Sequence, residues 1–453
     1  MVKRVDSTKG SLNRLIFLYA IPLILSTILQ NLFDVADKAV LGNMAGTTEV
    51  ASIAATTTVS GLVINGAVGL SAGTAIMLAR FVGQKSTEKI RKTIDTSLLT
   101  AVFVGLLVAV AGFLLAPFFL NATNCPAECY DGALIYMRIV LSAAPITLLY
   151  NYGSAILRTL GDSQRPLVYI AIAGVINVVL NVILCLVLPQ KVVAVAIATI
   201  TSNIVSVVLI LNRLRHLEDG TQVDLRHLRF DPTTFFGIVR FGVPASISQI
   251  VLPLGNLQIT TAINSYGASA LAGHSASISA EMFSFAIGNG FANTAMTFIG
   301  QNIGAGNVDR VKKTFWLCLL YNMLISGTIG VLTYLTGEFW LGLIVGASST
   351  EAISYGMARL LYVAVFMFIF AISAILTESM KAFGYPMLTS ITNIAINLGF
   401  RVIWMQFVYP LYPHFATIMQ CYTVAWILNL VFYILFSSIV YTRYVKKGIC
   451  KEI

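Results

Sequence analysis

Twelve long, almost uncharged segments run through this sequence and restrict the folds open to it. They lie near residues 14–38, 50–79, 94–117, 132–157, 166–188, 192–212, 236–263, 271–299, 314–336, 353–377, 387–409 and 415–441. Each is long enough to cross a hydrocarbon layer of about 30 Å as a helix. Membrane barrels use alternating strands of about ten residues, a pattern absent here. The sequence therefore predicts an all-α polytopic membrane protein with twelve transmembrane helices.

Composition excludes a water-soluble enzyme. Of 453 residues, 57% are hydrophobic and only 11% are charged, whereas soluble chains carry about 25% charged residues. The spans hold no Ser/His or His/Asp/Glu combination of an embedded enzyme, and the chain lacks a phosphate-binding loop. We therefore expect a protein that is not an enzyme and has no cofactor or resident metal, with transport that is passive or driven by an H+ or Na+ gradient.

The basic residues predict the orientation of the chain. The segments expected on one side of the membrane hold 24 of the 29 Lys and Arg residues. Because cytoplasmic loops carry the basic excess, both termini are expected to be cytoplasmic in a plasma-membrane protein. The net charge of +10 then reflects orientation and contact with the lipid bilayer, and no nucleic-acid partner is expected. Cys125 and Cys129 fall in an outer loop, as a disulfide or as two free thiols.

The two halves of the chain repeat each other at a nearly constant offset. Pro22 pairs with Pro244, and Asn177 pairs with Asn397, while Gly161 falls opposite Lys381, so that this glycine is expected to be lost. A six-helix unit returns to its starting side, so the copies form a parallel repeat, a plan of secondary transporters. We expect an N-terminal lobe (1–211), a cytoplasmic linker (212–235) and a C-terminal lobe (236–453).

A polar stripe on the first helix is the leading candidate for an ion site. It contains Gln30, Asn31, Asp34, Asp37 and Lys38, spaced by three and four residues. Asp34 and Lys38 can pair with each other, which leaves Asp37 as the unmatched acid. A carboxylate in a poorly solvated cavity can bind and release a proton or a monovalent cation. The alternative is that Asp37 lies in the outer headgroup region and only ends the helix.

Further polar residues follow in later spans. Asn177 and Asn181 lie one turn apart in the fifth expected helix, and Thr199 lies in the sixth. Interhelical hydrogen bonding alone would also explain them. In the second half, Glu281 and Arg401 are expected to form a buried pair.

Two apolar residues accompany that second-half acid. Met282 and Phe285 follow Glu281 closely in the sequence and would suit a pocket for bulky cations. Met and Phe in membrane helices more often pack in the core or face lipid, which is the alternative. Both readings stay open at this level.

Three short patterns resemble those of the multidrug and toxic compound extrusion (MATE) family. They are Asp37-x-x-x-Leu41-Gly42 followed by Gly46 and Ala51, Leu160-Gly161-Asp162 followed by Pro166, and Gly300-Gln301-Asn302-Ile303-Gly304-Ala305. The resemblance covers nearly the whole chain and fits best the bacterial branch with an acid in the first helix.

This resemblance implies an antiporter that exports organic cations or amphiphilic drugs by alternating access. It assigns ion coupling to Asp37 with Asn177 and Thr199, and we add Asp34 and Asn181 to that set. Family members usually have Asp where this chain has Asn181. We therefore expect H+ coupling, with a Na+ site at Asp37, Asn177, Asn181 and Thr199 as the alternative. The expected substrate-binding residues are Gln30, Asn31, Glu281, Met282, Phe285 and Arg401.

Other functions remain open at this level. A lipid-linked substrate flippase of the same superfamily often has fourteen helices, two more than are counted here. A channel would need neither an acid inside a span nor two lobes. The expected partners are small organic cations or amphiphiles, and the chain is expected to act as a monomer.

Overall fold

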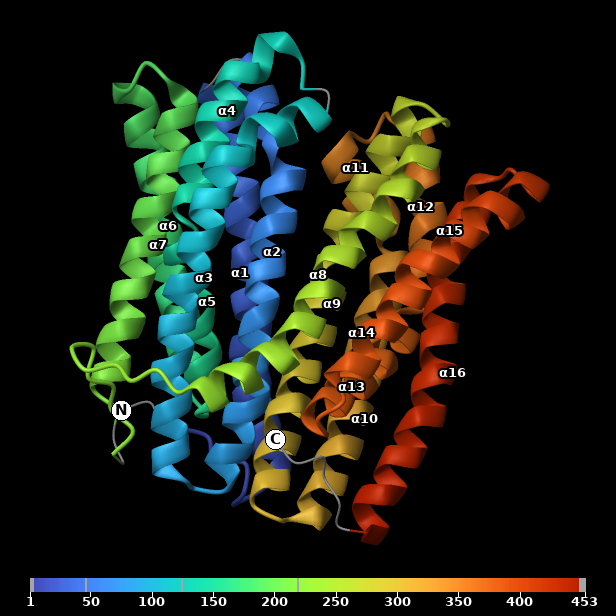
Figure 1. Cartoon of the computed structure of the whole chain (residues 1–453). Coiled ribbons are helices and arrows are strands. Elements are labelled where there is room, and N and C mark those ends of the chain that lie inside the picture. Colours follow the sequence, from blue (N-terminus) through green and yellow to red (C-terminus); the bar gives the residue numbers. More distant parts are fainter. Residues whose placement is uncertain (1–3, 45–46, 124, 218–219, 448–453) are drawn as a thin grey trace. The chain divides into compact units, whose positions relative to one another are not determined.

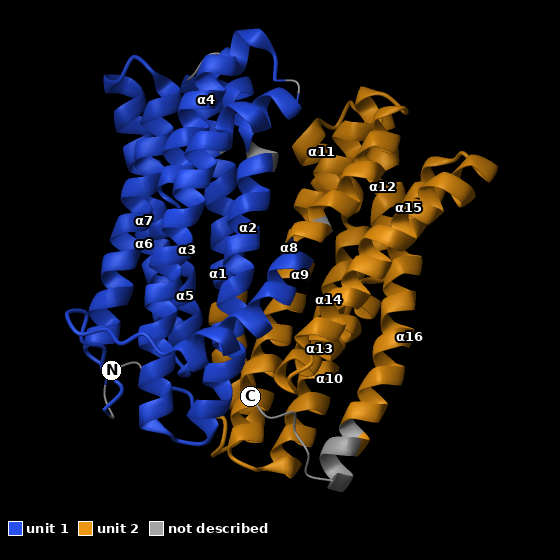
Figure 2. Cartoon of the chain, viewed as in Figure 1, with its two compact units in different colours: residues 1–5, 25–249 blue, residues 6–24, 250–453 orange. Residues whose placement is uncertain are grey.

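The computed structural model describes residues 4–44, 47–123, 125–217 and 220–447. Within these ranges all regular secondary structure is helical, which confirms the predicted class (Figure 1). The chain divides into two compact units (Figure 2). Residues 1–5 and 25–249 form unit 1, and residues 6–24 and 250–453 form unit 2.

Eight helices contribute to unit 1. They are α1 (Leu12–Met44), of which the part from residue 25 belongs here, α2 (Thr47–Gly83), α3 (Thr87–Ala122), α4 (Ala127–Ser142), α5 (Ala144–Thr159), α6 (Gln164–Val187), α7 (Lys191–Arg215) and the first half of α8 (Pro232–Asn264). Gly46, part of the first family-like motif, lies outside the described residues.

Unit 2 contains the remaining helices. They are the start of α1, the second half of α8, α9 (Ala268–Gly304), α10 (Val308–Leu335), α11 (Gly337–Val345), α12 (Thr350–Val363), α13 (Met367–Ala382), α14 (Pro386–Ile394), η1 (Ala395–Phe400), α15 (Arg401–Ile403), η2 (Trp404–Val408), η3 (Tyr409–Leu411) and α16 (Phe415–Lys447). The predicted lobes, 1–211 and 236–453, therefore differ from the packing units in where α1 and α8 are divided. The lobe boundaries and the linker 212–235 stay a prediction.

The twelve expected spans correspond to helices of the structure. Among the described residues, nine helices are long and apolar enough to cross a membrane, and two bent helix pairs raise the number to eleven. The twelfth is α9, which has 37 residues and is long enough to span at about 1.5 Å per residue. Among the helices of the described residues, α11 is the one that was not expected, and its nine residues are too few to cross.

Bent helix pairs at matching positions display the internal repeat. The axis turns by 45° between α4 and α5 and by 47° between α12 and α13. Each pair then ends in a glycine with positive φ, Gly161 at +90° and Gly384 at +88°. The expectation that the second half lacks this glycine is therefore wrong. The loop that follows is three residues shorter before Pro386 than before Pro166, which displaced the alignment.

The first residues of α8 explain why the linker ends where it does. Pro232 opens the helix, where its fixed φ is favourable and its missing N–H costs nothing. Asp231 accepts hydrogen bonds from the backbone N–H of Thr234 at 2.8 Å and from the hydroxyl of Thr233 at 3.1 Å. The Thr234 side-chain and backbone hydrogen bonds hold the pKa of Asp231 below its ordinary value. Asp231 thus acts as an ionised cap.

Glycines on α2 allow backbone-to-backbone packing inside unit 1. A Cβ on Gly73 would lie 2.2 Å from the carbonyl oxygen of Ile238, and one on Gly69 would lie 2.4 Å from the Cα of Ser246. No side chain separates α2 from the first half of α8 at these points. Small residues at such close helix contacts are common in membrane bundles. By contrast, Gly61 faces open space.

We predict that Gly73→Ala destabilises the protein by about 1–3 kcal/mol because the added methyl group meets backbone that cannot move aside. Gly61→Ala is the matched control on the same helix. It is expected to be neutral or slightly stabilising, since alanine has the higher helix propensity. Thermal unfolding of the purified protein in detergent measures both. Equal effects of the two substitutions would contradict the proposed role of the contact.

Candidate functional site

Side chains from α1, α6 and α7 meet inside unit 1. Asn181 Nδ2 donates to Asp37 Oδ1 at 2.7 Å and to Asn177 Oδ1 at 3.2 Å. Asn177 Nδ2 donates in turn to Thr199 Oγ1 at 3.4 Å. The structure therefore brings together Asp37, Asn177, Asn181 and Thr199, while their role in ion coupling stays a prediction. We call these four residues the Asp37 cluster.

Local geometry accounts for this convergence. Asn177 and Asn181 are four residues apart, so they lie on the same face of α6, and both are buried. Just before them, Gly174 lets α1 approach closely. A Cβ at this glycine would lie 1.9 Å from the ring of Phe33. Asp37 follows Phe33 by one helical turn and so reaches the amide of Asn181.

The orientation of the Asn177 amide depends on the protonation of Asp37. When its oxygen points toward the carboxylate, the Asn177 amide accepts a hydrogen bond from Asn181. The amide oxygen then faces a carboxylate oxygen of Asp37, and this contact is favourable only if Asp37 carries a proton. With its nitrogen toward the carboxylate, it donates to both carboxylate oxygens at 2.5 and 3.1 Å, and then meets the Asn181 nitrogen at 3.2 Å. The first arrangement suits a neutral Asp37 and the second suits an ionised one.

The remaining polar residues of α1 lie along the same stripe. Asp34 precedes Asp37 by about one turn and its side chain is exposed, as is that of Gln30, while Asn31 is half-buried. The expected pairing of Asp34 with Lys38 is not tested, because the Lys38 side chain lies outside the described residues.

In unit 2, the expected pair of Glu281 and Arg401 is wrong. Glu281 is fully buried and its Oε2 accepts from Arg359 Nη2 at 2.8 Å. Arg359 Nη1 also lies 3.5 Å from His274 Nδ1. A buried carboxylate needs a close cation, and α12 rather than α15 supplies it.

Arg401 has other neighbours. Its Nη1 donates to Asn256 Oδ1 on α8 at 2.6 Å. Its guanidinium carbon lies 4.8 Å from the centroid of Tyr422, and that of Arg359 lies 4.9 Å from the same ring. Both distances fit cation–π contacts. The two arginines therefore share one aromatic ring, and among the described residues a carboxylate pairs with Arg359 but not with Arg401.

The two expected apolar substrate contacts, Met282 and Phe285, are both half-buried. Phe285 makes edge contacts with Phe370, at 4.9 Å between centroids, and with Trp426, at 6.2 Å. It therefore packs against the hydrophobic core of unit 2. A direct substrate role of either stays a prediction.

Four features of this region were not predicted from the sequence. They are the roles of His274, Tyr422 and Asn256, and the pairing of Arg359 with Glu281. One signal was available for His274, because it precedes Glu281 by seven residues and so lies on the same helix face. For the other three, the partner is on a different helix, and spacing along the chain does not reveal it.

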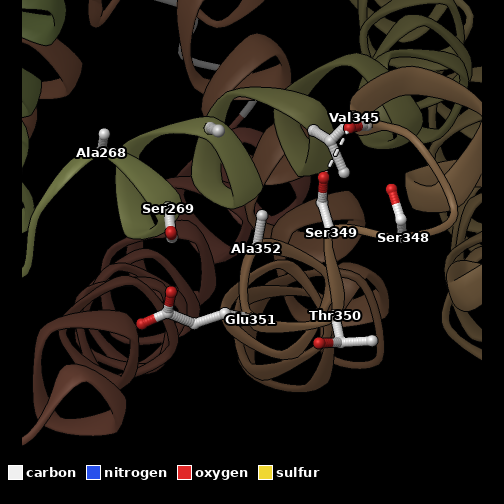
Figure 3. A pocket seen from close by; sticks show the side chains of 9 residues that line it. Ala268, Ser269, Val345, Ser348, Ser349, Thr350, Glu351 and Ala352 are labelled. Carbon is white, nitrogen blue, oxygen red and sulfur yellow. Dashed lines mark hydrogen bonds between the residues drawn. The ribbon is translucent and has the colours of Figure 1, made fainter.

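A separate cavity of about 450 Å³ lies in unit 2 between the start of α9 and the start of α12 (Figure 3). The carboxylate of Glu351 extends toward Ser269, and Ser349 Oγ donates to the Val345 carbonyl at 2.9 Å. None of the expected site residues lines this cavity.

Cys125 and Cys129 were expected to form either a disulfide or two free thiols. In the structure both are free thiols.

An all-helical membrane protein with two copies of a six-helix repeat, and with polar clusters buried inside each, has the architecture of a secondary transporter. The model of the MatE family matches residues 22–183 and again residues 244–405. The chain belongs to the MatE family of multidrug efflux transporters. The two matches begin at Pro22 and Pro244, which confirms the repeat and its offset.

Individual relatives agree with this assignment. The chain is 26% identical over 405 residues to the probable multidrug resistance protein YoeA of Bacillus subtilis, with 87% of this chain and 86% of the relative covered. It is 26% identical over 302 residues to the FAD transporter of Shewanella oneidensis, covering 64% and 65%. A solved structure described as the outward-facing conformation of a multidrug resistance MATE family transporter has the same fold, with a TM-score of 0.87 at 21% identity over 97% of this chain and 99% of that one.

Family membership establishes that the protein is a multi-pass membrane transporter rather than an enzyme, and that small molecules are its substrates.

We predict that truncating either partner of the Arg359–Glu281 pair destabilises the protein by about 3–5 kcal/mol, since a buried charge is left without its partner. Replacing both residues by Met is expected to restore most of that loss. The exposed pair of Lys92 and Glu88, 2.7 Å apart, is the control, where Lys92→Met costs less than about 1 kcal/mol. Thermal unfolding in detergent gives the values. Additive losses in the double variant would contradict a coupled pair.

Proposed function

We propose that this chain is an antiporter that exports amphiphilic small molecules in exchange for protons, and that Asp37 carries the coupled proton. One observation carries the proposal. Asp37 is the carboxylate of a hydrogen-bonded cluster whose other three members are neutral: Asn177, Asn181 and Thr199. Asp34, one turn earlier on the same face, belongs to the proposed coupling set as a second charge on the path to Asp37.

The amide of Asn177 gives this site two hydrogen-bonded arrangements. A neutral Asp37 donates to the amide oxygen, and an ionised Asp37 accepts from the amide nitrogen. Loading and unloading a proton thus changes the contacts between α1, α6 and, through Thr199, α7. A proton can shift a conformational equilibrium only if it binds the two states with different affinity, and this rearrangement supplies such a difference.

Proton coupling is favoured over Na+ coupling by the charge of the cluster. A dehydrated cation needs oxygen ligands with enough negative charge, and Asn181 contributes an amide where a second carboxylate would help. Asp37, Asn177, Asn181 and Thr199 still offer oxygen atoms, so Na+ remains the competing ion.

For the substrate side, Gln30 and Asn31 on the α1 stripe are proposed contacts in unit 1, with Met282 and Arg401 in unit 2. The relatives include a probable multidrug resistance protein and an FAD transporter, and FAD is an anionic compound. The basic residues further support cytoplasmic termini in the plasma membrane. Measuring export by the native and Asp37→Asn proteins also distinguishes an antiporter from a lipid-linked flippase. Transport by a flippase would depend neither on a proton gradient nor on Asp37.

We predict that Asp37→Asn abolishes the export of a labelled organic cation driven by a pH gradient in proteoliposomes, because the amide cannot load a proton. Asp131→Asn, an exposed acid on α4, is the matched control and should export at the normal rate. Full gradient-driven export by the Asp37→Asn protein would show that the coupling assignment is wrong.

Adding a second acid to the cluster should change the coupling ion. In the Asn181→Asp protein, a carboxylate replaces the amide whose nitrogen lies 2.7 Å from Asp37, so the negative charge available to a cation doubles. We predict that an imposed Na+ gradient, at equal pH on both sides, drives export by this variant but not by the native chain. Export by the native chain under the Na+ gradient alone would favour the Na+-coupled mechanism instead.

A further inference from the structure

The Asp37 cluster has a counterpart in unit 2 with reversed charge. The offset in residue number between Asn177 and Asn397 also places Arg401 opposite Asn181. The step that relates Pro22 to Pro244 places Asn256 opposite Asp34 and Ile259 opposite Asp37. In unit 1 an amide on α6 donates to a carboxylate on α1, whereas in unit 2 a guanidinium on α15 donates to an amide on α8.

Arg401 keeps most of its binding capacity unused. The side chain is 4% exposed, yet among the described residues its one hydrogen bond goes to Asn256, and its Nε has no partner. A guanidinium has five N–H donors arranged in a planar fork. Tyr422 covers a face of that plane, so the remaining N–H groups lie along its edge. Asn256 itself is exposed, so this edge lies next to accessible surface.

The buried charges of this region do not cancel. Among the described residues, Glu281 forms its ion pair with Arg359, and no carboxylate lies within ion-pair distance of Arg401. Together, Glu281, Arg359 and Arg401 carry a net positive charge, whether His274 is protonated or neutral. A buried charge without a counter-charge is costly, and inside membrane spans such groups commonly mark substrate or ion pathways.

The backbone around Arg401 also departs from a regular α-helix. Two π-helical segments, η1 and η2, flank the three residues of α15, and π turns occur frequently at functional sites. At Gly255 a Cβ would lie 2.1 Å from the carbonyl oxygen of Asn397. This close approach of α8 to η1 carries Asn256 to the guanidinium of Arg401.

We propose that Arg401, supported by Tyr422 and Asn256, binds an anionic oxygen group, phosphate or carboxylate, of a transported molecule. The guanidinium edge forms two parallel hydrogen bonds to such a group, the arrangement in which arginine recognises oxyanions most strongly. That the bound molecule is also exported rests on the proposed function. The binding itself does not, because it needs neither a gradient nor Asp37.

A pair of flavins tests this site in the full-length protein. Flavin mononucleotide and riboflavin share one fluorescent ring system and differ by a phosphate. We expect the native chain, purified in detergent, to bind flavin mononucleotide at least about tenfold more tightly than riboflavin, the effect of one charge-assisted hydrogen-bonded pair. Arg401→Gln should remove this preference. Competition by phenyl phosphate and by benzoate then distinguishes a phosphate site from a carboxylate site.

Arg138→Gln is the matched control, because Arg138 also lies over an aromatic ring, 4.7 Å from the centroid of Phe113, but in unit 1. It should leave the flavin preference intact. If Arg401→Gln does not fold, Arg401→Lys decides: it keeps the charge but loses the planar fork, so the preference should fall. Equal binding of the two flavins by the native chain, or an unchanged preference in the Arg401 variants, would overturn the proposal. Proton-driven cation export could persist in either case, so the two proposals fail separately.

Discussion

Hydrocarbon offers no hydrogen-bond partners, and this constraint determines most of the structure. Every backbone polar group in a span must be satisfied within the chain, which leaves helices as the means of crossing. The same constraint applies to side chains. Asn181 donates hydrogen bonds to Asp37 and Asn177 in unit 1, and Glu281 obtains Arg359 in unit 2. Polar residues that the membrane would otherwise exclude are thereby collected into two compact clusters.

The sequence predicted the helices well because hydrophobic length is a one-dimensional property. Each of the twelve expected spans coincides with a helix or a bent helix pair of the described residues, and the two bent pairs turn where α4 meets α5 and where α12 meets α13. The proximity of Asn177 and Asn181 to Asp37 was also predicted. Their four-residue spacing places both on one helix face, and the family resemblance indicated that this helix meets the one that carries Asp37.

Partner choice between helices was harder to predict. Glu281 and Arg401 were expected to pair because both are rare charges in the second half. Which of two arginines reaches an acid depends on how each helix is rotated about its axis, and the π-helical turns around Arg401 alter that rotation without a sequence signal. The missed glycine match at Gly384 has a related cause, since a shorter loop displaced the alignment.

The uneven spacing of the two copies has a practical consequence for chimeras. The step from Gly161 to Gly384, the two glycine turns, is three positions longer than the step from Pro166 to Pro386, the prolines that follow them. A segment exchanged between the copies by a constant offset would therefore shift everything beyond the turn by three residues, most of a helical turn. Grafts that count positions from the nearest glycine turn or proline would keep each side chain on its original face.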